Sequence, residues 1–298
     1  MRYPQSGISK ICGLFGKTRQ AWYVQQWSDK DDTVRDTIVL KSVKEIRVQM
    51  PRIGTRKLYH MLTETLQGHE IKIGRDKLFD LLEEYGMLVR HRKRRKVCTT
   101  DSAHPFRKYP NLVKELQIIR PNQLWVSDIT YIRICDGFGY LSLVTDAYSR
   151  KIVGYNLYPT LQKEGPVGAL KMALDTLPAT MVGSLIHHSD RGRQYCCDAY
   201  INVLTGKKAI ISMTEKGDPY ENALAERMNK TLKEEFLLDN GFDCFELAVA
   251  AVCKSVTTYN TLRPHESCNY LTPDQAHQLE GLMQMKWKRR ERKELIVT

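Results

Sequence analysis

The chain has 298 residues, of which 42% are hydrophobic and 27% charged, a composition typical of globular proteins that excludes a wholly disordered or collagen-like chain. This length allows about two domains. No stretch approaches the roughly 18 consecutive apolar residues of a membrane span, and the N-terminus lacks the apolar core of a signal peptide. The eight cysteines include no CxxC pair, which favours reduced thiols over a redox or zinc motif. We therefore expect a cytoplasmic protein with no membrane contact.

The net charge is +12, and the positive surplus is concentrated toward the N-terminus. Residues 1–110 contain 23 basic and 12 acidic side chains, whereas residues 111–298 contain 23 and 22. A basic region joined to a nearly neutral remainder is typical of a nucleic-acid-binding module attached to a domain with another task.

The N-terminal region is predicted to be helical. Apolar residues recur at helical spacing within residues 7–26, and Gly13 and Gly16 mark a turn, so we predict a short hairpin of helix-turn-helix type over residues 1–30. A helical DNA-binding domain is predicted over residues 31–96, with its apolar stripes assigned to the core. Its expected helices cover residues 33–49, 55–66 and 78–85.

A strongly basic run closes this region. Six cations within residues 90–96 form a segment that can bind nucleic-acid phosphates without recognising their sequence. We predict that these side chains contact DNA, and a solvated linker is the simpler alternative. The cations are Arg90, Arg92, Lys93, Arg94, Arg95 and Lys96. An extended linker is predicted over residues 97–120.

From residue 121 the pattern changes to strands rich in aromatic and β-branched residues. Short turns join the first three strands into a predicted antiparallel meander, after which helices and strands alternate. We predict an α/β domain over residues 121–280 and a basic C-terminal tail over residues 281–298. Strands are expected at 124–132, 140–145, 151–157, 184–188 and 209–213, and helices at 165–177, 194–206, 221–238 and 243–262.

Three carboxylates lie where this order of elements brings them together. Asp128 lies in the first strand, Asp190 follows the fourth, and Glu226 begins a long helix. The first and fourth strands are expected to be neighbours in the sheet, with the helix carrying Glu226 over them. Clustered carboxylates bind Mg²⁺ or Mn²⁺, and two such ions promote phosphoryl transfer. Asp146, at a hairpin turn, is interpreted as a structural residue outside this site.

The segments around the three acids resemble DDE transposases of the retroviral-integrase superfamily, and particularly the OrfB proteins of the third large insertion-sequence family. The resemblance is carried by the motifs LWVSDITY (residues 124–131), HSDRGRQY (188–195) and ENALAERMNKTLK (221–233), and by a closing block at 259–273. It extends to the N-terminal helical units. Departures occur beside the acids and in the closing block, which bears on the subgroup rather than the chemistry. They are Arg227, Met228 and Cys268.

This resemblance implies an RNase H-like catalytic domain with a mixed five-strand sheet flanked by helices. It implies an insertion-sequence transposase that cleaves DNA strands at the ends of its element and transfers the freed 3′-hydroxyl to target DNA. Asp128, Asp190 and Glu226 would hold two Mg²⁺ or Mn²⁺ ions. Lys233, two helical turns past Glu226, would contact DNA near the site.

Four further side chains are assigned by the same resemblance. His188 and Gln194 are expected to border the site, with His188 supporting it from behind rather than carrying a proton. Arg263 is assigned to DNA binding, although Arg263 and His265 could equally cap the fold. The chemistry needs no covalent protein–DNA intermediate, so no nucleophilic Ser or Tyr is assigned.

The expected partners are the terminal inverted repeats of the element, target DNA and further copies of this chain. In the family, OrfB is often the C-terminal part of a frameshift fusion, so an OrfA-type protein is a second expected partner. Two alternatives remain open: a non-catalytic DNA-binding regulator derived from a transposase, and a nuclease that cuts without joining. The intact triad favours an enzyme, either active alone or active only with the upstream partner.

Overall fold

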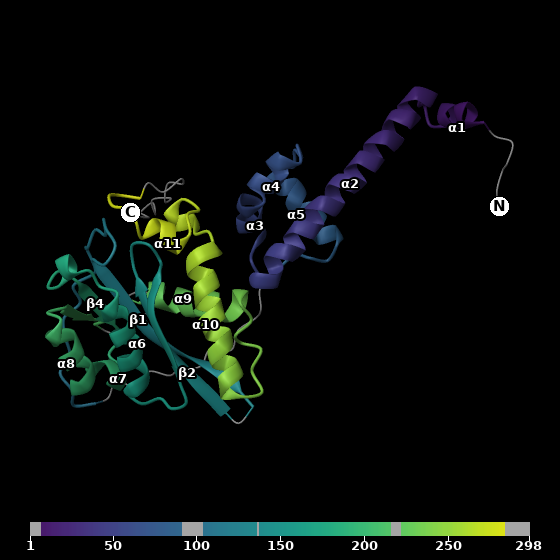
Figure 1. The fold of residues 1–298 in the computed structure, drawn as a ribbon. Helices are drawn as coiled ribbons and strands as arrows, with labels where there is room; N and C mark the ends of the chain where they lie inside the picture. The colour runs from purple at the N-terminus through teal and green to yellow at the C-terminus, as the bar shows by residue number, and fades with distance from the viewer. Residues whose placement is uncertain (1–6, 91–103, 136, 216–221, 284–298) are drawn as a thin grey trace, which may run out of the picture. The chain divides into compact units, whose positions relative to one another are not determined.

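The computed structural model describes residues 7–90, 104–135, 137–215 and 222–283, apart from the side chains of residues 25–31. It divides into two compact units (Figure 1). The helical unit contains the residues up to Val48 and Gly54–Val89, and the catalytic unit contains Gln49–Ile53 and the residues from Arg90 onward. Among the described residues, no helix is long and apolar enough to cross a membrane.

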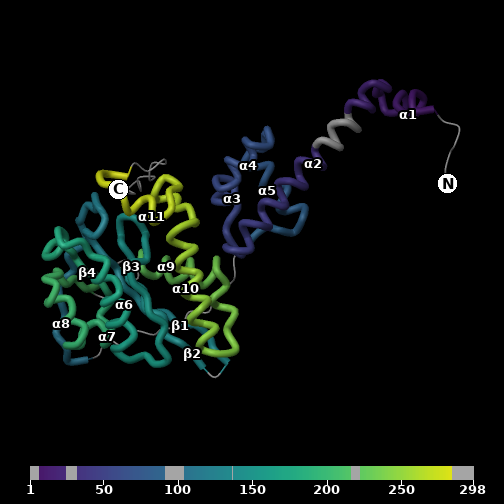
Figure 2. Tube along the Cα trace, in the orientation of Figure 1, coloured from purple at the N-terminus to yellow at the C-terminus, as the bar shows by residue number. Residues whose placement is uncertain are grey.

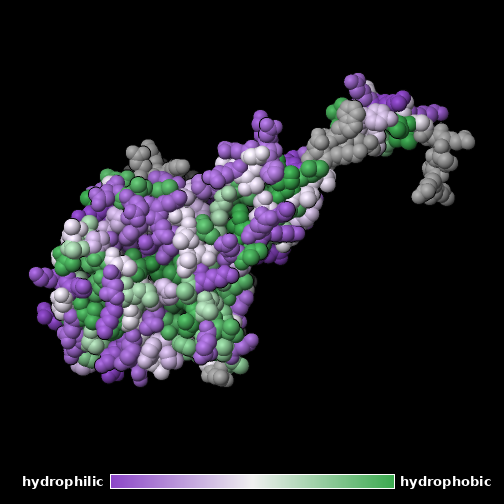
Figure 3. All heavy atoms as spheres, in the orientation of Figure 1, coloured by the Kyte–Doolittle hydropathy of each residue, from purple (hydrophilic) through white to green (hydrophobic). Residues whose placement is uncertain are grey.

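The helical unit has a core formed by the apolar stripes of its helices. Most residues of the stripes predicted from sequence are buried in it, among them Leu58, Leu78 and Leu82, whereas Tyr85 is 55% exposed. By contrast, the first helix and the residue after it expose the apolar residues Ile8, Ile11, Leu14 and Phe15. Figure 3 shows hydrophobic and hydrophilic residues interspersed on the visible face of each unit. The helices are α1 (Ile8–Leu14), α2 (Arg19–Gln49), α3 (Thr55–Met61), α4 (Thr63–Gly68) and α5 (Arg75–Glu84).

Two predicted boundaries in this unit need correction. The helix α2 runs without a break through residue 30, so the structure does not separate a hairpin over residues 1–30 from the helices that follow. The physical reason is that residues 19–49 contain neither glycine nor proline, and nothing interrupts their backbone hydrogen bonds. The single helix predicted over residues 55–66 is divided at Leu62 into α3 and α4.

The catalytic unit is built on a mixed five-strand sheet in the order β3-β2-β1-β4-β5. Figure 2 traces the chain through this unit and labels four of the strands, β1 to β4. Antiparallel pairing joins β1 to β2 and β2 to β3, and parallel pairing joins β1 to β4 and β4 to β5. This arrangement confirms the predicted meander and the predicted contact between the first and fourth strands. The strands are β1 (Leu124–Ile134), β2 (Gly137–Asp146), β3 (Ile152–Tyr158), β4 (Ile186–Ser189) and β5 (Ile210–Met213).

Helices cover both faces of this sheet, with α6, α7 and α8 on one face and α9 and α10 on the other (Figure 1). Gly154 of β3 lets α6 approach closely, since a Cβ atom there would lie 2.1 Å from the Ala169 carbonyl oxygen. The helix predicted over residues 194–206 is divided by the extended Cys197. The helices are α6 (Glu164–Asp175), α7 (Arg193–Cys196), α8 (Asp198–Gly206), α9 (Ala223–Glu235), α10 (Phe245–Leu262) and α11 (Pro273–Ala276), with 3₁₀ turns at Ala179–Met181 and Glu266–Cys268.

The described part of the predicted linker, residues 104–120, packs against the catalytic unit. Phe106 and Tyr109 contact its main core, and the Leu112 amide donates a hydrogen bond to Ser212 Oγ at 2.9 Å. The Met213 amide, in edge strand β5, donates to the carbonyl of Pro110 at 3.2 Å. These residues therefore belong to the catalytic unit, because their apolar side chains and polar backbone groups are satisfied there. The rest of the linker and tail residues 284–298 lie outside the described residues.

Candidate active site

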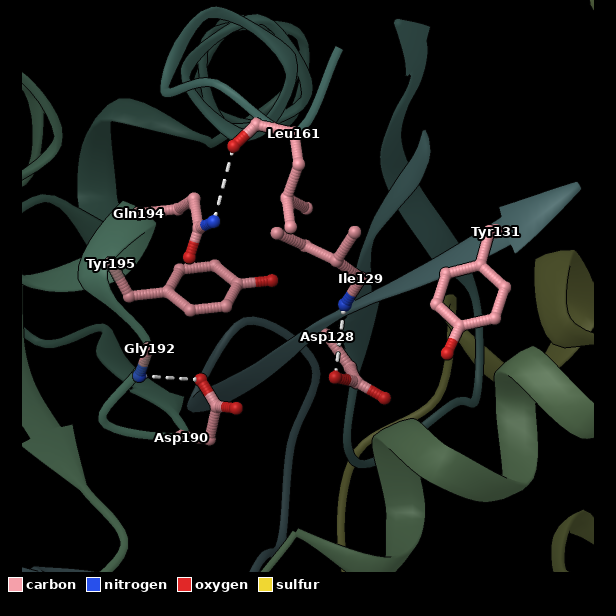
Figure 4. A pocket seen from close by; sticks show the side chains of 8 residues that line it. All are labelled: Asp128, Ile129, Tyr131, Leu161, Asp190, Gly192, Gln194 and Tyr195. Carbon is pink, nitrogen blue, oxygen red and sulfur yellow. Dashed lines mark hydrogen bonds between the residues drawn. The ribbon is translucent and has the colours of Figure 1, made fainter. Parts of the chain in front are cut away.

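Asp128 and Asp190 line one pocket of the catalytic unit (Figure 4). Their positions follow from the sheet. Strand β1 pairs with β4 only over Leu124–Val126, so the two strands part just before Asp128, and Asp190 follows directly after the last residue of β4. The prediction that these two acids come together is confirmed. The lining residues are Asp128, Ile129, Tyr131, Leu161, Asp190, Gly192, Gln194 and Tyr195.

The pocket disfavours negative charge on Asp128. Burial raises the pKa of Asp128 to about 7, and the neighbouring charges of Asp190 and, to a smaller extent, Glu226 contribute. Two hydrogen bonds oppose this shift: the Ile129 amide donates to Oδ1 at 2.9 Å, and Asn229 Nδ2 donates to Oδ2 at 2.7 Å. A carboxylate held in place yet short of compensating positive charge is suited to bind a cation.

The helix α9 turns one polar face toward β1. The Asn222 Nδ2 group donates a hydrogen bond to the carbonyl of Ser127 at 3.1 Å, and the Asn229 Nδ2 group donates one to Asp128. Glu226 and Lys233 occupy the other polar positions of this face. These positions are four, three and four residues apart, which is the spacing of one helix face. The face therefore fixes the helix against the strand that carries Asp128. It consists of Asn222, Glu226, Asn229 and Lys233.

Glu226 lies on this face but is exposed, and it does not line the pocket. Its charge nevertheless acts on the pKa of Asp128. In the described part of the chain, no three His, Cys, Asp or Glu side chains form a group ready to hold a metal. Two carboxylates thus share the pocket, and the third lies outside its lining. Oxygen donors of this kind suit Mg²⁺ or Mn²⁺.

The segment after β4 holds Asp190 through its own backbone. The Gly192 amide donates to Asp190 Oδ1 at 3.0 Å, and a Cβ atom at Gly192 would lie 3.0 Å from the same oxygen. Gln194 borders the pocket as predicted, where its Nε2 group donates to the Leu161 carbonyl at 3.1 Å (Figure 4). His188 is fully buried, and its Nδ1 atom lies 2.9 Å from Ser212 Oγ on β5. This position fits a support behind the site.

Sequence reasoning missed Asn229 and Tyr195. The signal for Asn229 was available, because it lies three residues after Glu226 and four before Lys233 on one helix face. Tyr195 is 2% exposed, and its hydroxyl has no hydrogen-bond partner among the described residues. Burial raises its pKa, and the charges of Asp128 and Asp190 add to this shift. The hydroxyl is therefore a neutral donor beside the two acids.

The predicted DNA-contacting cations differ in their surroundings. Lys233 Nζ donates to Thr130 Oγ1 at 3.2 Å beside the site, a place compatible with a nearby phosphate. Arg90 is exposed, and Arg92, Lys93, Arg94, Arg95 and Lys96 lie outside the described residues.

Arg263 does not fit its predicted role in DNA binding. It is 3% exposed and makes two hydrogen bonds to the Glu235 carboxylate, at 2.6 and 2.8 Å. A guanidinium buried against one carboxylate is not available to phosphates, because exposing it would leave Glu235 without its partner. The structure therefore favours the alternative, in which Arg263 joins α9 to the end of α10.

Comparisons with known proteins agree with the fold. Two family descriptions, both named "Integrase core domain", match residues 119–219 and 207–273. The chain is 32% identical over 269 residues to an uncharacterized 31 kDa protein of insertion element IS600 from Shigella sonnei, and covers 96% of it with 88% of its own length. It is 35% identical over 166 residues to the transposase of IS904 from Lactococcus lactis, covering 55% of this chain and 65% of that protein. It is 36% identical over 156 residues to transposase InsF of IS3A from Escherichia coli, covering 52% and 54%.

Among solved structures, the chain is similar to the catalytic core domain of HTLV-2 integrase determined with magnesium. The identity is 21%, the match covers 53% of this chain and 97% of the integrase core, and the TM-score is 0.41.

The sheet order and the integrase-core matches define the catalytic unit as an RNase H-like domain of the retroviral-integrase superfamily, the class of polynucleotidyl transferases. The match to the IS600 protein, which covers 96% of that protein, places the chain within a narrower family. The chain belongs to the insertion-sequence transposases, in which its OrfB-like motifs fit the IS3 family.

Proposed function

We propose that this transposase cleaves DNA at the ends of its element and joins the freed ends to target DNA, using Asp128, Asp190 and Glu226 as ligands of two Mg²⁺ or Mn²⁺ ions. The observation that carries the proposal is the shared pocket of Asp128 and Asp190, with Glu226 close enough to act on the pKa of Asp128. Carboxylates that hinder one another's ionisation gain stability when a cation joins them.

The proposed reaction has two steps. In cleavage, the oxygen of a water molecule bonds to phosphorus at the element's end, and the bond from phosphorus to the 3′-oxygen breaks. The 3′-oxygen leaves as a hydroxyl after taking a proton. In transfer, this hydroxyl oxygen bonds to a phosphorus of the target strand, the target's 3′-oxygen leaves, and the proton moves to it. Phosphodiester bonds are exchanged, so the transfer needs no energy cofactor.

The residues of the pocket have distinct tasks in this proposal. Bound divalent ions would activate the attacking oxygen and stabilise the leaving one. The Asn229 amide and the Gly192 backbone hold Asp128 and Asp190 in place. Lys233, at the edge of the pocket, is placed to steady a DNA phosphate by charge.

The partners proposed for this chain are DNA, further copies of itself and an OrfA-type protein. Transposition joins two element ends, so we propose at least a dimer on DNA. Mass photometry of the chain with paired-end DNA would test this assembly. A single copy per pair of ends would exclude it.

The direct test is a gel assay with labelled DNA that carries the flanking ends of the gene, in the presence of Mg²⁺ or Mn²⁺. We expect nicked and joined products from the protein, and none from Glu226→Gln or Asp190→Asn, while DNA binding persists in both variants. Near-normal cleavage by Glu226→Gln would sink the assignment. Binding without cleavage by the unaltered chain would point to a missing upstream partner, or to a regulator.

A further inference from the structure

Three aromatic side chains gather on one face of the β1–β2 hairpin. Tyr131 and Tyr140 are direct cross-strand partners, and their ring centroids lie 6.5 Å apart. The Phe138 ring lies 5.6 Å from that of Tyr131 in an edge-on arrangement. We call these three residues the hairpin aromatic cluster. Phe138 and Tyr140 are two residues apart on β2, and Tyr131 lies opposite Tyr140 on β1. The pleat of the strands therefore places all three side chains on one face of the sheet.

This cluster lies beyond the helix that covers the rest of the face. The first turn of α6 packs on Tyr158 of β3 and Ser142 of β2, where a Cβ atom at Gly165 would lie 3.1 Å from Tyr158 Cβ and 3.5 Å from Ser142 Oγ. Tyr140 pairs with Tyr158, and Phe138 lies two residues farther toward the hairpin end. Phe138 is consequently 52% exposed, although a phenylalanine in a strand is usually buried by a covering element.

The cluster is continuous with the carboxylate pocket and carries positive charge at its borders. Tyr131 lines the pocket with Asp128, on the side away from Gln194 and Tyr195 (Figure 4). The Lys233 ammonium lies 5.2 Å from the centroid of the Tyr131 ring. The exposed Arg133 is the direct cross-strand partner of Phe138.

We propose that the hairpin aromatic cluster binds an unpaired DNA base beside the phosphodiester that reacts in the pocket. Aromatic rings bordered by cations form the surface on which single-stranded nucleic acids stack their bases, since every base has a π-face and every nucleotide a phosphate. A protein partner with an apolar surface would not require two cations at the border. This inference deepens the proposed function and rests on it: the substrate at the site is a DNA end with its terminal bases separated.

Fluorescence anisotropy of the full chain without added metal tests this inference. Two labelled DNA ends of the same sequence are compared, one fully paired and one with a short unpaired stretch. We expect the protein to bind the unpaired end more tightly. Phe138→Leu and Tyr131→Leu should each reduce that preference by roughly tenfold, the order of magnitude of one stacked base. Tyr131→Phe keeps the ring and should retain the preference.

The matched control is Leu247→Ser on α10, which removes an apolar side chain of nearly the same exposure, 53% against 52% for Phe138, from another part of the unit. It should leave the preference unchanged. Equal binding of the unpaired end by Phe138→Leu and by the unaltered protein would overturn the inference. The inference would also be overturned if the unaltered protein formed a concentration-dependent dimer that Phe138→Leu abolished, while Phe138→Leu kept the preference for the unpaired end. Cleavage of the unpaired end by the unaltered protein with Mg²⁺ is scored separately, so failure of the proposed chemistry is distinguishable.

Discussion

Two acids on neighbouring strands show how the same side chain can be satisfied by nearby hydrogen-bond donors in one place and left beside another negative charge in the other. Asp146, at the end of β2, is 0% exposed and fully occupied. Its carboxylate accepts hydrogen bonds of 2.7 Å from the Asn122 amide, the Ser149 amide and the Ser149 hydroxyl. The Ser149 donors lie in the turn after β2, whereas the Asn122 amide lies in the segment before β1. The acid therefore joins the two segments and is structural, as the sequence predicted.

Asp128 is surrounded differently. It has two donors, from Ile129 and Asn229, but it also faces the charge of Asp190, and its pKa rises to about 7. The difference teaches that burial alone does not mark a functional acid. A carboxylate that lies beside another negative charge, with no positive charge to balance it, is stabilised when a cation binds. A carboxylate whose oxygens already accept hydrogen bonds from neighbouring donors gains less.

The contrast between Asp128 and Asp146 is tested most directly by replacing each carboxylate with a neutral amide. Asp128→Asn should lower metal-dependent strand cleavage on the order of a thousandfold or more, because a metal ligand is lost. Asp146→Asn should instead lower the free energy of unfolding by about 1–3 kcal/mol, because buried donors lose their acceptor. Cleavage assays and urea unfolding of both variants check this pair. Normal cleavage by Asp128→Asn, or lost cleavage by a folded Asp146→Asn, would contradict the division of roles.

A pH series sharpens the same contrast. Without metal, the folded protein binds the Asp128 proton more tightly than the unfolded chain does, because the folded pKa is about 7 and the ordinary value about 4. This contribution to stability is complete below pH about 4 and is lost as the pH rises through about 7. Asp128→Asn should therefore become progressively more stable than the unaltered protein across this window. A difference in stability that stays flat would refute the raised pKa.

Asn229→Ala tests how far the environment of Asp128 prepares the site. Loss of the 2.7 Å hydrogen bond frees Asp128 to rotate, and supporting contacts of this kind typically contribute 10- to 100-fold to metal affinity. We therefore expect Asn229→Ala to need a 10- to 100-fold higher concentration of Mg²⁺ or Mn²⁺ for the same thermal shift. Lys230→Ala, an exposed change on the same helix, is the control. Equal metal response in both variants would assign Asn229 to packing alone.

The smallest expected effect concerns two tyrosine hydroxyls. Tyr195→Phe removes a buried hydroxyl without a partner among the described residues, and should raise the free energy of unfolding by about 1 kcal/mol. Tyr200→Phe removes a hydroxyl that lies 2.9 Å from His187 Nε2, and should lower it by a similar amount. Thermal unfolding of the two variants compares these opposite signs. Destabilisation by Tyr195→Phe would mean that its hydroxyl is satisfied in solution.

Much of this site was predictable from the chain alone because its signals are local. The strand pattern around Asp128, the turn after Asp190 and the helix beginning before Glu226 each lie within one short segment. The order of strands then placed the first and fourth side by side, as the sheet confirms. The interpretation of Asp146 as a turn acid also needed only its own hairpin.

The assignments that failed depend on contacts between distant segments. Arg263 has the charge of a DNA-binding residue. It lies 28 residues from Glu235 in the sequence, and only the folded structure shows that the two side chains form an ion pair. Residues 104–120 have the composition of a linker, yet they pack on a sheet edge formed a hundred residues later. Composition describes what a side chain can do, and tertiary contact decides whether it is available.

The sequence by itself predicted the order of elements, because strand pleat, helix period and turn chemistry act over a few residues. Its motifs around Asp128, Asp190 and Glu226 carried the resemblance to the family. Tertiary structure decided that Glu226 is exposed and does not line the pocket that Asp128 and Asp190 share. It also decided that Asn229 donates a hydrogen bond to Asp128 and that Phe138 is exposed because α6 does not cover it. Burial and electrostatic repulsion depend on which segments meet in space, and no local pattern encodes that distance.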